Sequence, residues 1–194
     1  MSDKADQPEK IEKIGGWVQL TSNCVYENPW ISVHHQTVTR PNGSDGIYGL
    51  VHFKGHAVGI VPIDEHGNTW LVRQSRYTLD QFTWEIPEGG AAAGEPTLEC
   101  AKRELEEEVG LKAERWQELM RLHTSNSVTD ERAVVYIAEG LSEGEQSLDP
   151  TEDIEVKKLP LKDAVEMVLN GDITDAISVA ALLKVHATLN SAQP

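Results

Sequence analysis

The sequence predicts an α/β fold made of short strands, an internal helix and two closing helices. From Trp17 onward, short runs alternate apolar and polar residues between turn signals such as Pro41-Asn42-Gly43, which is typical of antiparallel strands. Helical spacing of apolar residues marks residues 96–109, 160–170 and 172–189. A chain of 194 residues with this pattern fits one α/β domain with an N-terminal appendage.

The domain boundaries follow from changes in composition along the chain. Residues 1–14 are mostly polar and charged and are predicted to form a mobile tail. Residues 15–54 contain three alternating runs and are predicted to form a small antiparallel sheet. Residues 55–194 contain the remaining strands and all three helices, and are predicted to form the main domain.

The stretch of residues 89–111, GGAAAGEPTLECAKRELEEEVGL, contains the strongest local signal. Pro96 suits the first helical position, and Gly110 stands where a helix commonly stops in the left-handed conformation. Four apolar residues recur at intervals of three and four between these two points, so they share one buried stripe. These residues are Leu98, Ala101, Leu105 and Val109.

Three glutamates crowd one side of the same predicted helix. At about 100° per residue, Glu104 and Glu108 lie about 40° apart, and Glu107 lies roughly 60° beyond Glu104. Only Arg103 points toward this side, although carboxylates four residues apart repel by about 0.2–0.5 kcal/mol. An acidic solvated face is one interpretation, and a site for Mg²⁺ or Mn²⁺ is the other. The flexible backbone of GGAAAG, which can approach a bound metal or phosphate closely, favours the metal site.

The same stretch resembles the Nudix box over 23 consecutive residues. The pattern is a glycine, five residues, a glutamate, seven residues, Arg-Glu, an aliphatic residue, any residue, Glu-Glu, any residue, a glycine and an aliphatic residue. Every position matches, at Gly89, Glu95, Arg103, Glu104, Leu105, Glu107, Glu108, Gly110 and Leu111. The resemblance implies an α/β/α sandwich, with a mixed sheet between helices. It also implies a Mg²⁺- or Mn²⁺-dependent hydrolase that cleaves the diphosphate of a nucleoside diphosphate linked to another group.

The segment before the box resembles the ADP-ribose pyrophosphatase branch of this family. Q-S-R-Y contains Arg76, whose planar fork suits a substrate phosphate, with a surface salt bridge as the alternative. W-E-I-P-E-G contains Glu85, a candidate substrate-binding residue. In the same segment Glu88 replaces the usual alanine, and family resemblance assigns a metal-binding role to the backbone carbonyl at that position. The branch is usually marked by a proline beyond the box, and Asn126 or Ser127 stands there instead, which leaves the exact substrate open.

Two tryptophans of the predicted appendage are candidates for binding a nucleobase. G-W-V-Q-L contains Trp17 and N-P-W-I-S-V contains Trp30, and both segments resemble those of ADP-ribose pyrophosphatases. In those enzymes the appendage is exchanged across a homodimer, and its aromatic residues hold the adenine between them. The resemblance therefore implies a homodimer formed through residues 15–54, with simple packing within the sheet as the alternative.

An acidic loop before the final strand is the candidate source of a general base. In related enzymes such a loop carries a glutamate that closes over the substrate as base or binds a further metal. By position Glu152 is the first candidate, with Asp153 second and Asp149 third, and an exposed acidic loop is the alternative.

The amino-acid composition indicates which binding partners and which cellular compartment to expect for this protein. Seventeen basic and thirty-two acidic residues give a net charge of −15, which disfavours nucleic acids and anionic membranes as partners. No apolar run approaches 18 residues, and Cys24 and Cys100 lack metal-binding or redox spacing. We therefore expect a cytoplasmic protein with ordinary reduced thiols.

The resulting hypothesis is hydrolysis of a nucleoside diphosphate sugar, with ADP-ribose as first choice, yielding AMP and ribose 5-phosphate. Glu104 and Glu108 would ligate the ions, Glu107 would assist, Glu152 would be the catalytic base, and Arg103 would orient the glutamates. Another Nudix substrate stays open, such as GDP-mannose, a dinucleoside polyphosphate or an oxidised nucleotide. A non-catalytic domain that senses a nucleotide is the alternative from a different functional class.

Overall fold

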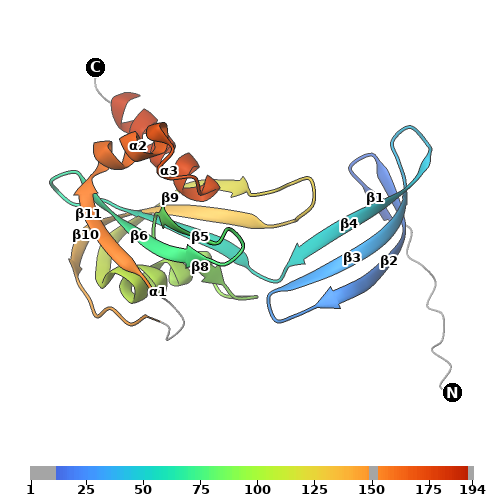
Figure 1. Cartoon of the computed structure of the whole chain (residues 1–194), viewed down its shortest axis with the longest axis horizontal. Helices are drawn as coiled ribbons and strands as arrows, with labels where there is room; N and C mark the ends of the chain where they lie inside the picture. Colours follow the sequence, from blue (N-terminus) through green and yellow to red (C-terminus); the bar gives the residue numbers. More distant parts are fainter. Residues whose placement is uncertain (1–11, 149–152, 192–194) are drawn as a thin grey trace. The chain divides into compact units, whose positions relative to one another are not determined.

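The computed structural model describes residues 12–148 and 153–191, which form two compact units (Figure 1). The first unit comprises the chain up to Lys54 together with Ser125–Glu131, and the second comprises Gly55–Thr124 and the chain from Arg132 onward. Sequence order alone did not indicate that residues 125–131 pack with the N-terminal strands, because they lie beyond the predicted helix.

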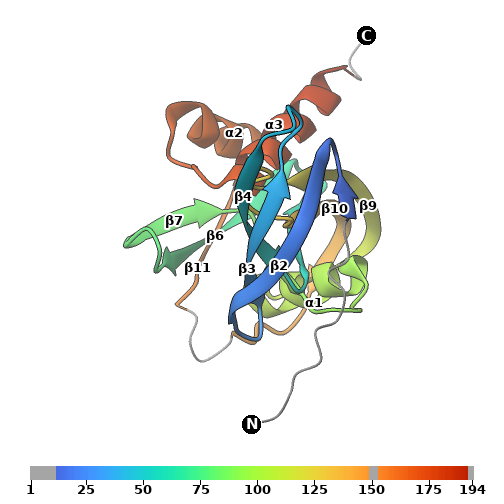
Figure 2. The same cartoon turned by 90° about the vertical axis from the view of Figure 1, so that its right-hand side faces the viewer.

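The first unit is an antiparallel sheet in which β1, β2, β3 and β4 lie side by side in chain order (Figure 2). The strands are β1 (Glu12–Ile14), β2 (Trp17–Glu27), β3 (Ile31–Thr39) and β4 (Asp45–Phe53). The predicted tail of residues 1–14 is wrong at its end, because β1 pairs with the start of β2 through Ile14 and Trp17. The rest of that tail, up to residue 11, lies outside the described residues.

The loop of residues 125–131 is held against β4 by side chains of that strand. The Tyr48 hydroxyl donates to the Ser127 carbonyl at 2.6 Å, and His52 Nδ1 lies 2.5 Å from Asp130 Oδ2. The other carboxylate oxygen of Asp130 accepts the Phe53 N–H at 2.9 Å. The loop that carries Asn126 and Ser127 is therefore part of the first unit.

The second unit contains two further sheets. One has the order β8-β5-β10-β9 and is mixed, because β5 and β10 run parallel while the outer pairs are antiparallel. The other has the order β11-β6-β7 and is antiparallel. The strands are β5 (His56–Pro62), β6 (Asn68–Arg76), β7 (Gln81–Glu85), β8 (Glu88–Ala91), β9 (Leu111–His123), β10 (Arg132–Glu143) and β11 (Glu155–Pro160).

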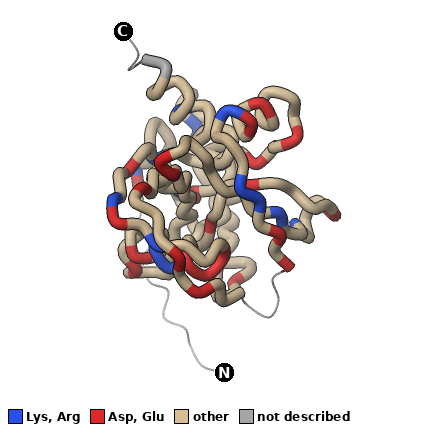
Figure 3. The backbone as a smooth tube through the Cα atoms, turned by 90° about the vertical axis from the view of Figure 1, so that its left-hand side faces the viewer, with Lys and Arg blue, Asp and Glu red and all other residues tan. Residues whose placement is uncertain are grey.

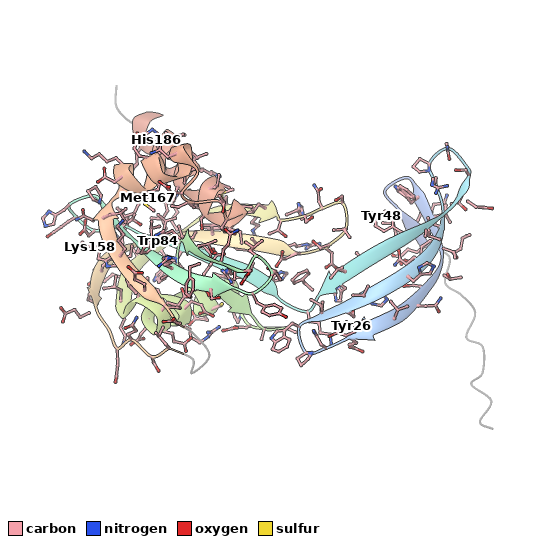
Figure 4. All side chains as sticks on the ribbon, viewed as in Figure 1. Tyr26, Tyr48, Trp84, Lys158, Met167 and His186 are labelled. Atoms are coloured by element: carbon pink, nitrogen blue, oxygen red, sulfur yellow. The ribbon has the colours of Figure 1, made fainter. Side chains whose placement is uncertain are left out.

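Helices cover the mixed sheet on both faces, as Figures 1 and 4 show for α1 on one face and for α2 and α3 on the other. The helices are α1 (Thr97–Val109), α2 (Leu161–Asn170) and α3 (Ala176–Ser191). On the α1 face, Ala101 and Leu105 pack with Val58 and Val134 in one buried cluster. A larger cluster beneath α2 and α3 includes Val61, Leu71, Val135, Ile177 and Leu182. The α/β/α sandwich expected for this chain is confirmed.

The start of the last helix differs from the sequence prediction, and the difference has a local cause. The last helix was expected from residue 172 but begins at Ala176, because Asp175 caps it by accepting the Ser178 N–H at 2.7 Å. Strand β9 starts at Leu111, directly after the α1 helix, and therefore includes Trp116. Pairing with β10 along its whole length stabilises this long strand.

Candidate functional site

Helix α1 places its glutamates at the boundary between core and solvent. Pro96 is the residue before the helix, and Gly110 ends it in the left-handed conformation with φ 71°. Ala101 and Leu105 are fully buried, so the C-terminal half of α1 packs closely against the sheet. As a result Glu104 is only 9% exposed and Glu108 only 2% exposed.

Arg103 joins the carboxylates of this helix. Its Nη1 donates to Glu104 Oε1 at 2.7 Å and to Glu107 Oε2 at 2.9 Å. Its Nε lies 3.4 Å from Glu95 Oε1. Burial alone would lower the pKa of the guanidinium, but the hydrogen bonds and charges of Glu107 and Glu104 raise it above its ordinary value. Arg103 therefore offsets the repulsion between these glutamates and holds them in one orientation.

The start of β8 is bonded directly to the helix. The Glu88 N–H donates to Glu108 Oε2 at 3.0 Å, so the backbone of residue 88 lies beside the most buried carboxylate of α1. The Glu88 side chain is half-buried. Burial raises the pKa of its carboxyl well above the ordinary value, and the negative charges of Asp175 and Glu85 raise it further.

This raised pKa predicts a pH-dependent cost in stability. A carboxyl whose pKa is higher in the folded than in the unfolded state contributes most to the stability of the fold below its unfolded pKa, which is 4.5 here. This contribution to stability is lost as the pH rises through the folded pKa. We therefore expect Glu88→Gln, without added divalent cations, to raise the melting temperature at pH 8 more than at pH 5. Thermal unfolding at both pH values checks this, with Glu114→Gln, an exposed glutamate of β9, as control for the lost charge. A gain that is equal at the two pH values would contradict the expectation.

Gly89 leaves the space that the Glu104 carboxyl occupies. A Cβ at residue 89 would overlap the carboxyl group of Glu104, whereas a Cβ at residue 90 meets no atom within 4 Å. The glycine therefore brings backbone and carboxylate oxygens close together beside Glu108. Hard divalent cations prefer such oxygen ligands, so the donor set around Gly89 fits Mg²⁺ or Mn²⁺. In the described ranges 12–148 and 153–191, however, no three His, Cys, Asp or Glu side chains are already arranged as a metal centre.

Adding a methyl group at residue 89 is expected to displace Glu104. We predict that Gly89→Ala lowers turnover by about 10-fold or more, because the acidic side chain must leave its place between Gly89 and Arg103. The matched variant Gly90→Ala is expected to stay within about twofold of the parent protein, since open space surrounds that position. Steady-state kinetics of the two alanine variants make the comparison, and equal rates would contradict it.

Arg76, the last residue of β6, and Glu85, the last residue of β7, form an ion pair on the β6–β7 hairpin. Arg76 Nε donates to both Glu85 oxygens at 2.9 and 3.1 Å, and Nη2 also contacts Glu85 Oε2. The Thr83 hydroxyl donates to the same carboxylate at 2.5 Å. Glu85 is 2% exposed, and its hydrogen bonds raise the pKa of the Arg76 guanidinium. The salt bridge considered from the sequence is therefore present, but its carboxylate is buried.

A pocket of about 290 Å³ opens beside this pair. It is lined by residues of the hairpin and of the start of α3, among them Arg76, Thr83, Glu85, Thr174 and Asp175. Sequence reasoning singled out Arg76 and Glu85 as candidates for substrate binding but did not single out Thr174 and Asp175, which line the same pocket. The signal for Asp175 was available, because aspartate is among the residues preferred at the position just before a helix.

The two tryptophans of the first unit have different surroundings. Trp17 is half-buried and packs edge-on against Tyr48, with ring centroids 5.5 Å apart. Both line a pocket of about 250 Å³ in that unit, together with Gln36, Asn126 and Thr129. Figure 4 labels Tyr48 on this sheet. Trp30 does not line the pocket and is 73% exposed.

The candidate general bases of the acidic loop lie only partly within the described residues. Glu152 and Asp149 lie outside the described residues, and Asp153 is exposed. Burial and the nearby charge of Glu104 raise the pKa of the Cys100 thiol to about 12. Cys100 is therefore an uncharged thiol at neutral pH, which is consistent with a structural role beneath α1.

Comparison with known families identifies the second unit. The model described as "NUDIX domain" matches residues 54–182, which is more than half of the chain. The chain belongs to the Nudix family. A second model, described as "Nucleoside diphosphate sugar hydrolase N-terminal domain", matches residues 17–51 of the first unit. The protein is a Nudix pyrophosphohydrolase, a class that generally uses divalent metal ions.

Several curated Nudix relatives cover most of the chain. An ADP-ribose pyrophosphatase of Mycobacterium tuberculosis is 37% identical over 90% of this chain and 86% of its own length. An ADP-ribose pyrophosphatase of Bacillus subtilis is 32% identical over 84% and 89%. The solved structure of an ADP compounds hydrolase superposes with a TM-score of 0.83 at 23% identity, covering 94% of this chain and 98% of that one, and supports the fold.

In this Nudix chain the box runs from Gly89 of β8 through α1 to Leu111, the first residue of β9. Figure 3 marks the acidic and basic residues along the backbone, and the acidic ones are the more numerous in the sequence. Among the described residues, every helix is too short or too polar to span a membrane.

Proposed function

We propose that this Nudix enzyme hydrolyses ADP-ribose to AMP and ribose 5-phosphate with Mg²⁺ or Mn²⁺. The observation that carries the proposal is the Glu104, Glu107 and Glu108 cluster beside Gly89, in a chain that also has a nucleoside diphosphate sugar hydrolase N-terminal domain. The names of the curated relatives from Mycobacterium tuberculosis and Bacillus subtilis support the choice of ADP-ribose.

The side chains of the site divide the work. Glu104 and Glu108 would hold the divalent cations, with Glu107 and the Glu88 carbonyl as further ligands, and Arg103 keeps the glutamates oriented. When bound, such cations supply positive charge to the diphosphate and lower the pKa of a bound water. Arg76, oriented by Glu85, would hold a phosphate. From the sequence, Glu152 is the acceptor of the proton of the attacking water, with Asp153 and Asp149 as alternatives.

The first unit would bind the base and a second copy of the chain. Trp17 offers one aromatic wall of a pocket whose size suits part of a nucleoside, and stacking on a base contributes roughly 1–3 kcal/mol. Trp30 is mostly exposed, which suits a residue that forms a base-binding site together with a second copy of the chain. We infer a cytoplasmic homodimer formed through residues 15–54, without nucleic-acid or membrane partners, in agreement with the net charge of −15.

Turnover on a substrate panel tests the proposal. The protein is incubated with ADP-ribose, GDP-mannose, a dinucleoside polyphosphate and an oxidised nucleotide, each with Mg²⁺, with Mn²⁺ and with a chelator. We expect AMP and ribose 5-phosphate from ADP-ribose, no product with the chelator, and the highest kcat/KM for ADP-ribose. A higher kcat/KM for another compound would overturn the choice of ADP-ribose and identify that compound as the preferred substrate.

Calorimetry separates the enzyme from a nucleotide sensor. Tight binding of ADP-ribose in the presence of Mg²⁺, with no cleavage over hours, would overturn the enzymatic proposal in favour of a sensing domain. Glu104, Glu107 and Glu108 are all present, which favours cleavage.

A further inference from the structure

Three consecutive residues before the Nudix box are each bonded to a different element of the second unit. The Pro87 carbonyl accepts the Ile60 N–H of β5 at 2.8 Å. The Glu88 N–H donates to Glu108 Oε2 of α1 at 3.0 Å. The Ile86 N–H donates to Ser178 Oγ of α3, also at 3.0 Å. The backbone that leads into Glu88 and Gly89 therefore depends on one side chain that is far from the box in sequence.

Ser178 itself is held in a single place. It is fully buried at 0% exposure, and its own N–H donates to Asp175 Oδ2 at 2.7 Å, which fixes the first turn of α3. Its hydroxyl oxygen also lies 3.4 Å from Glu88 Oε1. One hydroxyl group thus contacts both the backbone and a side chain of the segment 86–88.

We propose that Ser178 is a positioning residue for the metal-binding half of the site formed by Glu88 and Glu108. The inference rests on the proposed function in one respect, namely that these groups hold a divalent cation. Ser178 acts through Ile86 and Glu88, which its hydroxyl group contacts.

The Ile86 N–H would lose its hydrogen-bond acceptor if the Ser178 hydroxyl were removed. Ile86 is fully buried, so without the Ser178 hydroxyl its N–H has no acceptor and no water to replace it. The segment relaxes by shifting toward another acceptor, which moves the Glu88 N–H away from Glu108. Outer groups that orient metal ligands typically change metal affinity or activity by about 10–100-fold when removed.

The experiment compares Ser178→Ala with Ser178→Thr, which keeps the hydroxyl, and with Thr188→Ala. Thr188 is an exposed residue of the same helix whose hydroxyl donates to the Lys184 carbonyl within α3, so it is the matched control. For each protein, circular dichroism establishes folding, electron paramagnetic resonance measures the Mn²⁺ dissociation constant without substrate, and kinetics give kcat and KM for ADP-ribose.

We expect Ser178→Ala to weaken Mn²⁺ binding and to lower kcat by about 10-fold or more, while KM changes by less than about threefold. Ser178→Thr is expected to recover most of both losses, and Thr188→Ala to match the parent protein. If Ser178→Ala does not fold, Ser178→Cys, which retains a weak acceptor, takes its place with a smaller expected effect.

Unchanged Mn²⁺ affinity in folded Ser178→Ala would overturn the inference, as would equal losses in Thr188→Ala. The two proposals fail separately. If the parent protein binds Mn²⁺ but leaves ADP-ribose intact, the substrate proposal fails, and weaker Mn²⁺ binding in Ser178→Ala still supports the role of Ser178.

Discussion

Replacing Glu108 with glutamine is expected to lower kcat/KM for ADP-ribose by more than about 100-fold while the fold stays intact. Glutamine keeps an oxygen that accepts the Glu88 N–H, so the bond between β8 and α1 survives. It loses the negative charge that strengthens the attraction between this ligand and a hard divalent cation. The loss should exceed the 10–100-fold typical of residues that only support metal ligands.

Glu106→Gln is the matched control for Glu108→Gln. Glu106 lies on the same helix, but its carboxylate pairs with Lys112 Nζ at 2.9 Å on the surface. Breaking an exposed pair of this kind costs about 0–1 kcal/mol, and we expect kcat/KM within about twofold of the parent protein. Circular dichroism and steady-state kinetics at saturating Mg²⁺ check both variants. Comparable activity in Glu108→Gln would remove the box from the mechanism.

Removing Arg76 is expected to produce the largest loss of stability among the ion pairs. Arg76→Met leaves the buried Glu85 carboxylate with the Thr83 hydroxyl but without its cation. Breaking a buried pair in this way costs about 3–5 kcal/mol. We expect about 3 kcal/mol in urea unfolding, at the lower end, because the Arg76 side chain is 37% exposed.

The double variant Arg76→Met, Glu85→Met separates stability from substrate binding. Two apolar side chains of similar volume can replace a buried ion pair at little cost, so the double variant should regain most of the lost stability. Its turnover of ADP-ribose should stay low if Arg76 holds a phosphate. Arg73→Met is the control, because Arg73 and Glu155 form an exposed pair at 3.4 Å. Full activity in the stable double variant would show that the pair is structural only.

Local sequence patterns predicted those features of the site that depend on neighbouring residues of α1 and on the glycine that ends it. The stripe of Ala101 and Leu105 predicted which side of α1 is buried, and Gly110 predicted its end. The angles between Glu104, Glu107 and Glu108 follow from helix geometry alone. The extent of burial of Glu104 and Glu108 did not follow, because it depends on the sheet beneath the helix.

Contacts between distant segments escaped the sequence. Ile86 and Ser178 are 92 positions apart, and no local pattern indicates that a serine of α3 accepts a hydrogen bond from the segment before β8. The partner of Arg76 was open for a similar reason. Arg76 pairs in register with Gln81 and Glu85 with Val72, and the Arg76 side chain reaches Glu85 along the β6–β7 hairpin.

By itself, the sequence determined the Nudix box, the helix that carries it and the class of chemistry that three crowded glutamates support. Only the tertiary structure decided that Arg103 bonds Glu104 and Glu107, that residues 125–131 pack with the first unit, and that Ser178 anchors the segment before the box. The physical reason is that helix periodicity is set by neighbouring residues along the chain. Which elements then meet is set by the packing of the whole core.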